Sequence, residues 1–227
     1  MRQAGSTGCR TTTQPSATVA ADHSLPLPHP RSSQPAADEE VCYHFFAGDE
    51  ADRTDGTAAY AAAWGVPMIE EDIAIGGWAH NWFNDEIFDQ RLARARQGLI
   101  RYAHAGFPCW TFTRLLIMSG ILRDDSHPNG VDGLSADKRA KVDYADALLR
   151  RLIQLFTAIF DAGGDFSIEQ PGPTSNPDLI SFLAGSRKHF DLTRMPEFIT
   201  FMEYTGAIWV VYYTCAIDDS GPKKPVI

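Results

Sequence analysis

The sequence predicts an α/β fold in which a mostly parallel sheet is covered by helices on both faces. Short apolar runs alternate along the chain with amphipathic stretches. The longest stretch, 137–160, presents a large apolar residue on almost every turn, which indicates a helix packed on a sheet. Strands that alternate with helices are typical of parallel sheets. We therefore expect a Rossmann-like three-layer sandwich, in which ligands sit at the carboxyl ends of the strands.

The first four predicted elements each end at a glycine or a charged cluster, and both are signals that stop helices and strands. They are strand 42–47 before Gly48, helix 56–64 before Gly65, strand 66–70 before the acidic cluster Glu70, Glu71 and Asp72, and helix 85–97 before Gly98. The first helix is rich in alanine. The second carries its apolar residues at helical spacing on one face.

The later elements follow the same alternation. They are strand 99–105, helix 137–160 before Gly163 and Gly164, strand 166–169, helix 176–183 with Asn176 as N-cap, and strand 207–215. The last segment is predicted to be a strand because it is aromatic and β-branched.

Residues 1–40 are predicted to be a disordered tail, and 41–227 a single domain. The tail is rich in Ser, Thr, Pro and Ala and contains almost no large apolar residues. Its first part carries Arg2 and Arg10 but no acid, a composition that also suits an organellar transit peptide.

The composition indicates the cellular compartment and limits the kinds of ligand that we expect the protein to bind. No apolar run approaches the roughly 20 residues of a membrane span. The four cysteines lie far apart without C-x-x-C spacing, so we expect reduced thiols, no metal site, no membrane partner and an intracellular protein, nuclear or cytoplasmic. The net charge of −9 argues against strong nonspecific DNA affinity. Four arginines do cluster in sequence, and we expect them on a solvated helix face; they are Arg91, Arg94, Arg96 and Arg101.

Three segments fall at predicted strand ends, namely 46–48, 106–109 and 169–171. A single cysteine is more often a buried hydrophobe than a nucleophile, and a single glutamate is more often a surface group. Because carboxyl ends of parallel strands meet at one edge of a sheet, Cys109 and Glu169 are nevertheless expected to share a site.

Together these segments resemble the cytosine-C5 DNA methyltransferases. Phe-Ala-Gly at 46–48 is similar to the family's F-x-G, Gly-Phe-Pro-Cys-Trp-Thr-Phe-Thr at 106–113 resembles its nucleophile loop G-x-P-C-x-x-F-S, and Ile-Glu-Gln-Pro at 168–171 resembles its E-N-V or E-N-P segment. The order of the segments is also the family's. The resemblance covers the chain from about residue 42 to the C-terminus. It is closer to a divergent branch of methyltransferase-like proteins found in protist genomes and mobile elements.

The resemblance implies roles for four residues in catalysis. Cys109 would be the thiolate that adds to carbon 6 of cytosine, which activates carbon 5 for methylation. Pro108 would fix the backbone before it. Arg114 would supply a positive charge that favours the thiolate, or else have a plain structural role. Glu169 would hold the exocyclic amine and ring nitrogen 3 of a base flipped out of the duplex.

The methyl donor implied by the resemblance is S-adenosylmethionine. Phe46, Ala47 and Gly48 would lie near its methionine part. Glu71 or Asp72 would bind the ribose hydroxyls, with a solvated loop as the alternative interpretation of these acids. Asn81 stands where the family often has an aspartate that contacts the adenine amine.

The sequence also departs from the family. Asp49 and Glu50 follow Gly48 in place of a second glycine, and Gln170 replaces an asparagine. We find no arginine-rich Q-x-R-x-R segment and no target-recognition domain, so DNA binding is expected to be weak without a separate DNA-recognition partner. A second hypothesis is therefore a degenerate, noncatalytic methyltransferase-like domain. A third, a cysteine hydrolase, is disfavoured because no histidine follows a strand and His104 is expected inside one.

Overall fold

The computed structural model describes residues 36, 38–48, 57–63, 65–66, 68–112, 120–171, 190–208, 210, 212–213 and 225–226. The expected helix at 176–183, almost all of the expected tail and the candidate Arg114 lie outside these residues.

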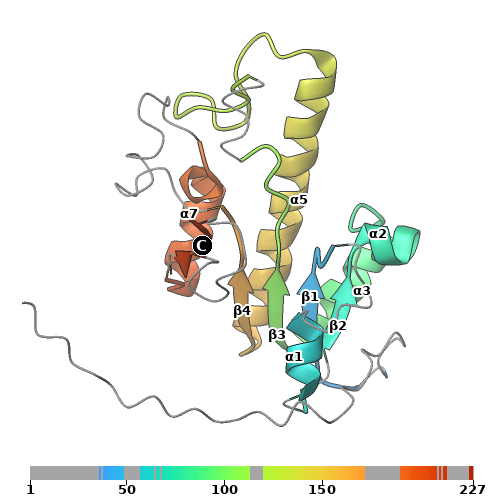
Figure 1. Cartoon of the computed structure of the whole chain (residues 1–227). Coiled ribbons are helices and arrows are strands. Elements are labelled where there is room, and N and C mark those ends of the chain that lie inside the picture. Colours follow the sequence, from blue (N-terminus) through green and yellow to red (C-terminus); the bar gives the residue numbers. More distant parts are fainter. Residues whose placement is uncertain are drawn as a thin grey trace, which may run out of the picture.

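The centre of the protein is a four-stranded parallel sheet with the strand order β2-β1-β3-β4 (Figure 1). The strands are β1 (Val41–Phe45), β2 (Met68–Glu71), β3 (Ile100–Ala105) and β4 (Asp165–Ile168). Each of them overlaps a strand expected from the sequence. The prediction of an α/β fold with a mostly parallel sheet is confirmed.

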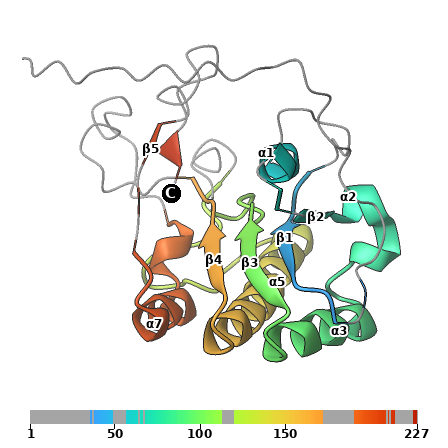
Figure 2. The same ribbon diagram turned by 90° about the horizontal axis from the view of Figure 1, so that it is seen from below.

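Helices cover both faces of this sheet. The longer ones are α1 (Thr57–Ala63), α3 (Asp85–Arg96), α5 (Ala136–Asp161) and α7 (Pro196–Thr205). Figure 2 shows α3, α5 and α7 on one face and α1 on the other, which makes three layers. Both ends of α5 lie within one residue of the predicted ones.

The main core lies between the sheet and the helices α3 and α5. Leu149, Leu152 and Phe156 of α5 are fully buried there, as are Tyr43 and Phe45 of β1. Burial of each such side chain contributes about 1.5–3 kcal/mol. Because side chains alternate along a strand, the β1 residue between Tyr43 and Phe45 faces the opposite layer.

The predicted strand 207–215 is confirmed only at 212–213 among its described residues, and not as part of the parallel sheet. Ala207, Ile208 and Val210 are irregular, and β5 (Tyr212–Tyr213) pairs antiparallel with β6 (Pro225–Val226) in a separate two-stranded sheet. Helix α7 was not predicted, although Pro196 marks its first turn and Gly206 its end.

Arg91 corrects the expectation of a solvated arginine face. Only 2% of its side chain is exposed, and its Nε and Nη2 lie 2.7 and 2.6 Å from Oε1 of Glu71, which is equally buried. Burial alone would lower the pKa of Arg91, but the charge and hydrogen bond of Glu71 outweigh burial and raise it. The charge of Arg91 therefore pairs with Glu71 inside the protein, between α3 and β2, and is not available at the surface.

Candidate functional site

The strand order reverses between β1 and β3, because the strands that follow β1 lie on its two opposite sides within the sheet. From β1, the chain first passes to its neighbour β2, and β3 lies on the other side of β1. In open parallel sheets, ligands bind outside the carboxyl ends of the strands at such a switch point. The segments 46–48 and 106–109 both begin there.

These two segments touch each other. The N–H of Gly106 donates to the carbonyl of Phe45 at 3.1 Å, and the rings of Phe46 and Phe107 meet edge to face at 5.9 Å. A Cβ on Gly106 would lie 3.1 Å from the Phe46 carbonyl oxygen, so the close approach favours glycine. Phe46 itself has a φ of 58°, a left-handed conformation that costs a non-glycine residue about 1–2 kcal/mol.

The segment after β1 is also tied to the end of β2. The N–H groups of Phe46 and Ala47 donate to the Glu71 carbonyl. The carboxylate of Asp72 accepts from the N–H of Gly48 at 3.0 Å through one oxygen and from the N–H of Ala74 at 2.8 Å through the other. Four residues expected at a donor site, Phe46, Ala47, Gly48 and Asp72, are therefore neighbours.

The two acids at this edge differ in what they can bind. Asp72 is partly exposed, and each of its oxygens has lone-pair capacity beyond the one backbone N–H that it accepts, which fits a pair of ribose hydroxyls. Glu71 does not fit, because its side chain is buried against Arg91. The expectation that Glu71 binds ribose is corrected by this contact.

Asn81 follows a short 3-10 helix, η1 (Gly77–His80), and is partly buried. Its side-chain oxygen accepts from the N–H of Phe83 at 3.0 Å. The next residue, Trp82, packs on Phe46 with ring centroids 4.8 Å apart. The chain around Asn81 thus lies against the segment after β1.

Cys109 lies in the segment after β3, four residues beyond the end of that strand. Its thiol is free and partly buried, and its carbonyl accepts from the N–H of Phe112 at 2.8 Å. Pro108 before it is also partly buried, whereas Phe107 and Phe112 are in the core. The two core phenylalanines anchor the loop on either side of the cysteine.

Glu169 directly follows β4 at the same edge. Its N–H donates to the Ala105 carbonyl at 2.8 Å, and the side-chain amide of Gln170 donates to the carbonyl of Phe107, two residues before Cys109. The backbone carrying Glu169 and the loop carrying Cys109 are therefore joined directly. The Glu169 side chain is 40% exposed.

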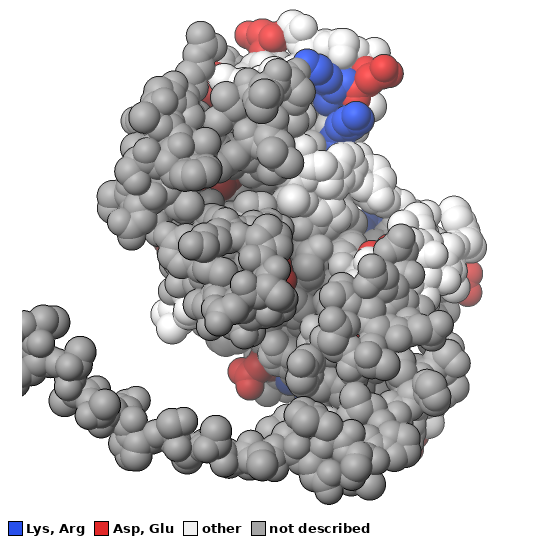
Figure 3. Space-filling model, in the orientation of Figure 1, with Lys and Arg blue, Asp and Glu red and all other residues white. Residues whose placement is uncertain are grey.

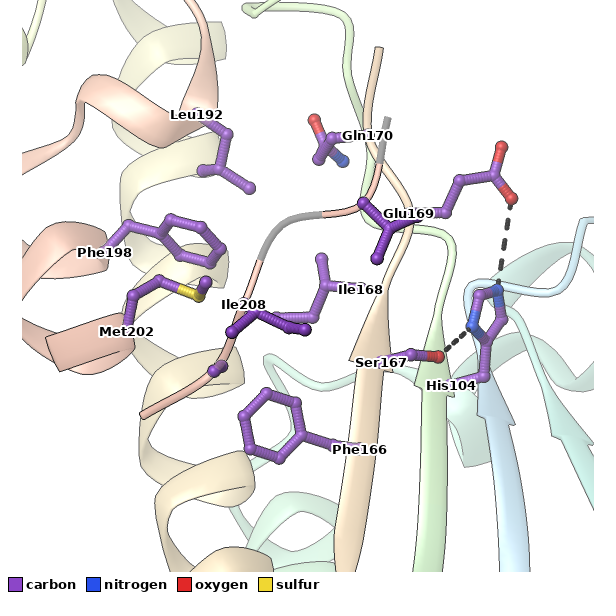
Figure 4. A pocket seen from close by; sticks show the side chains of 12 residues that line it. His104, Phe166, Ser167, Ile168, Glu169, Gln170, Leu192, Phe198, Met202 and Ile208 are labelled. Carbon is purple, nitrogen blue, oxygen red and sulfur yellow. Dashed lines mark hydrogen bonds and ion pairs between the residues drawn. The ribbon is translucent and has the colours of Figure 1, made fainter. Parts of the chain in front are cut away.

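His104 is a site residue that the sequence did not predict. It lies inside β3, as expected, but its Nε2 is 4.0 Å from Oε2 of Glu169 and its Nδ1 is 2.7 Å from the Ser167 hydroxyl (Figure 4). Burial and the neighbouring His44 lower the pKa of His104 to about 4. The signal available in the sequence was strand alternation, which places Ser167 and Glu169 on one side of their strand; the pairing register of β3 with β4 then brings His104 beside Ser167.

A cavity of about 290 Å³ lies beside β4, one of the two edge strands of the four-stranded sheet. Much of its lining is apolar and comes from β4 and α7, including Phe166, Ile168, Phe198 and Met202. Figure 4 shows Ser167 and Glu169 directed away from these side chains, toward His104. Glu169 is among the lining residues and Cys109 is not.

Charge and metal chemistry give no strong signal in the described part of the chain. Figure 3 shows Lys and Arg atoms interspersed with Asp and Glu atoms near the beginning of α5. Among the described residues, no group of three or more His, Cys, Asp and Glu side chains could hold a metal ion. No described helix is long and apolar enough to cross a membrane.

Comparison with models of known protein families, with curated proteins and with solved structures finds no match to this chain.

Proposed function

We propose that this protein is a cytosine-C5 DNA methyltransferase-like enzyme that methylates cytosine through a covalent adduct on Cys109. The observation that carries the proposal is the joining of the Cys109 loop to the segment of Glu169 by the Gln170 side chain. A thiol and a carboxylate at one edge of a parallel sheet are the two groups that this reaction requires.

Cys109 would form a bond from its sulfur to carbon 6 of the cytosine ring. Electron density then moves to carbon 5, which becomes nucleophilic enough to take a methyl group. Methyl transfer from S-adenosylmethionine to carbon 5 would leave S-adenosylhomocysteine. A base such as a water molecule would then take the carbon 5 proton while the bond between carbon 6 and sulfur breaks, which releases 5-methylcytosine and the Cys109 thiolate. Cys109 is only partly buried, and the core residues Phe107 and Phe112 would fix the backbone of its loop.

Glu169 would bind the same base through its amine edge. One carboxylate oxygen accepts a hydrogen bond from the exocyclic amine, and the carboxyl group holds a proton at ring nitrogen 3 as the thiolate adds. Its exposed fraction of 40% leaves it accessible to a base that has left the duplex.

S-adenosylmethionine would supply the methyl group at the switch point of the sheet. Asp72 would accept hydrogen bonds from its ribose hydroxyls, and Gly48, which lacks a side chain, would let it approach the backbone. Asn81 would accept from its adenine amine through the remaining capacity of its oxygen. Phe46 would pack against the donor beside Trp82.

A second candidate is a noncatalytic methyltransferase-like domain that binds a partner. Two observations favour it: both oxygens of Asp72 already accept backbone N–H groups, and the cavity beside β4 is lined by Glu169 without Cys109. In that case the domain folds but traps no cytosine.

The two candidates differ in one experiment, which uses duplex DNA containing 5-fluorocytosine. Fluorine at carbon 5 cannot leave as a proton, so an active enzyme with the methyl donor becomes trapped as a covalent complex. Denaturing electrophoresis should show this complex for the parent protein and for Cys42→Ala, whose thiol is buried. Cys109→Ser should not form it. A parent protein that stays folded and forms no complex, even with a DNA-recognition partner, would favour the noncatalytic domain.

A further inference from the structure

Four polar side chains form a line across β3 and β4 and end at the proposed base-binding carboxylate. The Tyr102 hydroxyl lies 2.6 Å from the Ser167 hydroxyl, which lies 2.7 Å from Nδ1 of His104. Nε2 of His104 lies 4.0 Å from Oε2 of Glu169. Figure 4 shows Ser167, His104 and Glu169 in this order.

The register of the two strands produces the line. His104 pairs with Ser167 across the parallel ladder, and alternation along each strand sends Tyr102, His104 and Ser167 to the same face. The fourth residue, Glu169, follows the end of β4 on that face. The arrangement is therefore built into two strands rather than into a mobile surface.

The direction of each hydrogen bond in the line depends on which nitrogen of His104 carries the proton. An ionised carboxylate only accepts, so a neutral His104 can donate to Glu169 only when Nε2 carries its proton. Nδ1 is then an acceptor and takes the proton of the Ser167 hydroxyl. Ser167 has no second proton, so the hydroxyl of Tyr102 donates to it.

The surroundings of His104 favour this neutral ring. His44 of β1 faces it with ring centroids 4.9 Å apart, and Glu70 of β2 lies behind His44, 3.5 Å from its Nδ1. Ser167 and Glu169 face His104 from the β4 side. Burial, followed by the charge of His44, lowers the pKa of His104 to about 4, so the ring is uncharged at neutral pH.

We propose that His104 is a positioning residue for Glu169, held by Tyr102 and Ser167 in the tautomer whose Nε2–H is presented to one oxygen of that carboxylate. The proposal rests on the function proposed above, in which Glu169 holds the base. The separation of 4.0 Å is too long for a hydrogen bond, and we expect it to shorten when a base is bound. A neutral donor orients the carboxylate without a full positive charge that would oppose its protonation.

The first test uses three variants in the adduct assay, measured as a rate at several pH values. His104→Leu removes the donor, His104→Gln retains an N–H, and His127→Gln changes a histidine that pairs with Asp124 on the surface. We expect His104→Leu to slow adduct formation about 10-fold or more and to change its pH profile, because hydrogen bonds to charged groups contribute that much. His104→Gln should restore part of the rate. Equal rates and equal pH profiles for His104→Leu and the parent would overturn the proposal.

The second test does not need activity, so it separates this proposal from the proposed function. Nitrogen-15 NMR of the histidine side chains distinguishes the two neutral tautomers in the folded parent protein. We expect His104 to carry its proton on Nε2, and Ser167→Ala to shift the population toward the other tautomer. A proton on Nδ1 in the parent protein would refute the proposed hydrogen-bond line, whether or not an adduct forms. If the expected tautomer is found but no adduct ever forms, the hydrogen-bond line stands, and the proposed function, with the role of His104 in it, fails.

Discussion

Arg91 and Glu71 form a buried ion pair between helix α3 and strand β2. Both side chains are 2% exposed, so neither can recover hydration if its partner is removed. Breaking such a pair typically costs about 3–5 kcal/mol, whereas replacing both partners by apolar groups is often much less harmful.

Arg91→Met should therefore lower the free energy of unfolding by about 3–5 kcal/mol, and the double variant Arg91→Met with Glu71→Leu should recover a large part of this loss. Urea denaturation of the parent, both single variants and the double variant forms a complete cycle. A loss of less than about 1 kcal/mol in both single variants, the range of surface pairs, would contradict the buried assignment.

His104 makes stability depend on pH. Its pKa is about 4 in the folded protein and 6.5 when unperturbed, so between these values the unfolded chain binds more protons. The stability from the uncharged ring is complete above about pH 6.5 and is lost as the pH falls toward 4. The shift corresponds to a loss on the order of 3 kcal/mol at most.

His104→Gln should flatten this part of the stability profile, and His127→Gln should change it much less because the pair of His127 with Asp124 is exposed. The measurement is the urea midpoint at pH 7.5, 6, 5 and 4.5. If the parent protein and His104→Gln lose stability in parallel across this range, the buried neutral histidine is excluded as the cause.

At the scale of elements, the loops after β1 and β2 form the proposed donor site through Asp72. Asp72→Asn keeps a side-chain oxygen for the N–H of Ala74 but removes the charge that would hold ribose hydroxyls. We expect this variant to weaken S-adenosylmethionine binding about 10-fold or more, since hydrogen bonds to charged groups are worth roughly 1.5–3 kcal/mol.

Isothermal titration calorimetry measures this binding, with Asp143→Asn as the matched control because Asp143 lies on the exposed side of α5. Absence of binding heat for the parent protein at millimolar donor would favour the noncatalytic domain. Equal affinity of Asp72→Asn and the parent would instead remove Asp72 from the donor site.

The elements of the sheet were predictable from the sequence because period and stop signals are local. Helix α5 and strands β1 to β4 were found in this way, each within about two residues of its observed ends. Segment 207–215 has β-branched and aromatic residues, but strand propensity depends on the neighbours available for pairing. Its described residues beside β4 therefore do not join the parallel sheet.

The candidate site was predictable to the same extent. Cys109, Glu169 and Asp72 follow strands, and the carboxyl ends of parallel strands meet at one edge. The contact of His104 with Glu169 depends on the pairing register of β3 with β4. The contact of Arg91 with Glu71 depends on how α3 packs against β2. Neither is encoded in local spacing, so Arg91 was expected on the surface and His104 was set aside.

At the scale of the whole molecule, charge limits how the protein meets DNA. The net charge of −9 opposes a polyanion, and phosphate contacts supply most nonspecific affinity. We therefore expect any adduct to form slowly, with weak sequence selectivity, and to decrease steeply between about 50 and 200 mM salt. A partner that supplies a basic surface should raise the yield without changing which cysteine reacts.

The most direct measurement is therefore mass spectrometry of the peptides released from the complex trapped on 5-fluorocytosine DNA. We expect the peptide containing Cys109 to carry the modified cytosine and the complex to require S-adenosylmethionine. Modification at Cys42 or Cys215 in place of Cys109, or no modified peptide from a folded protein supplied with donor and partner, would contradict this expectation.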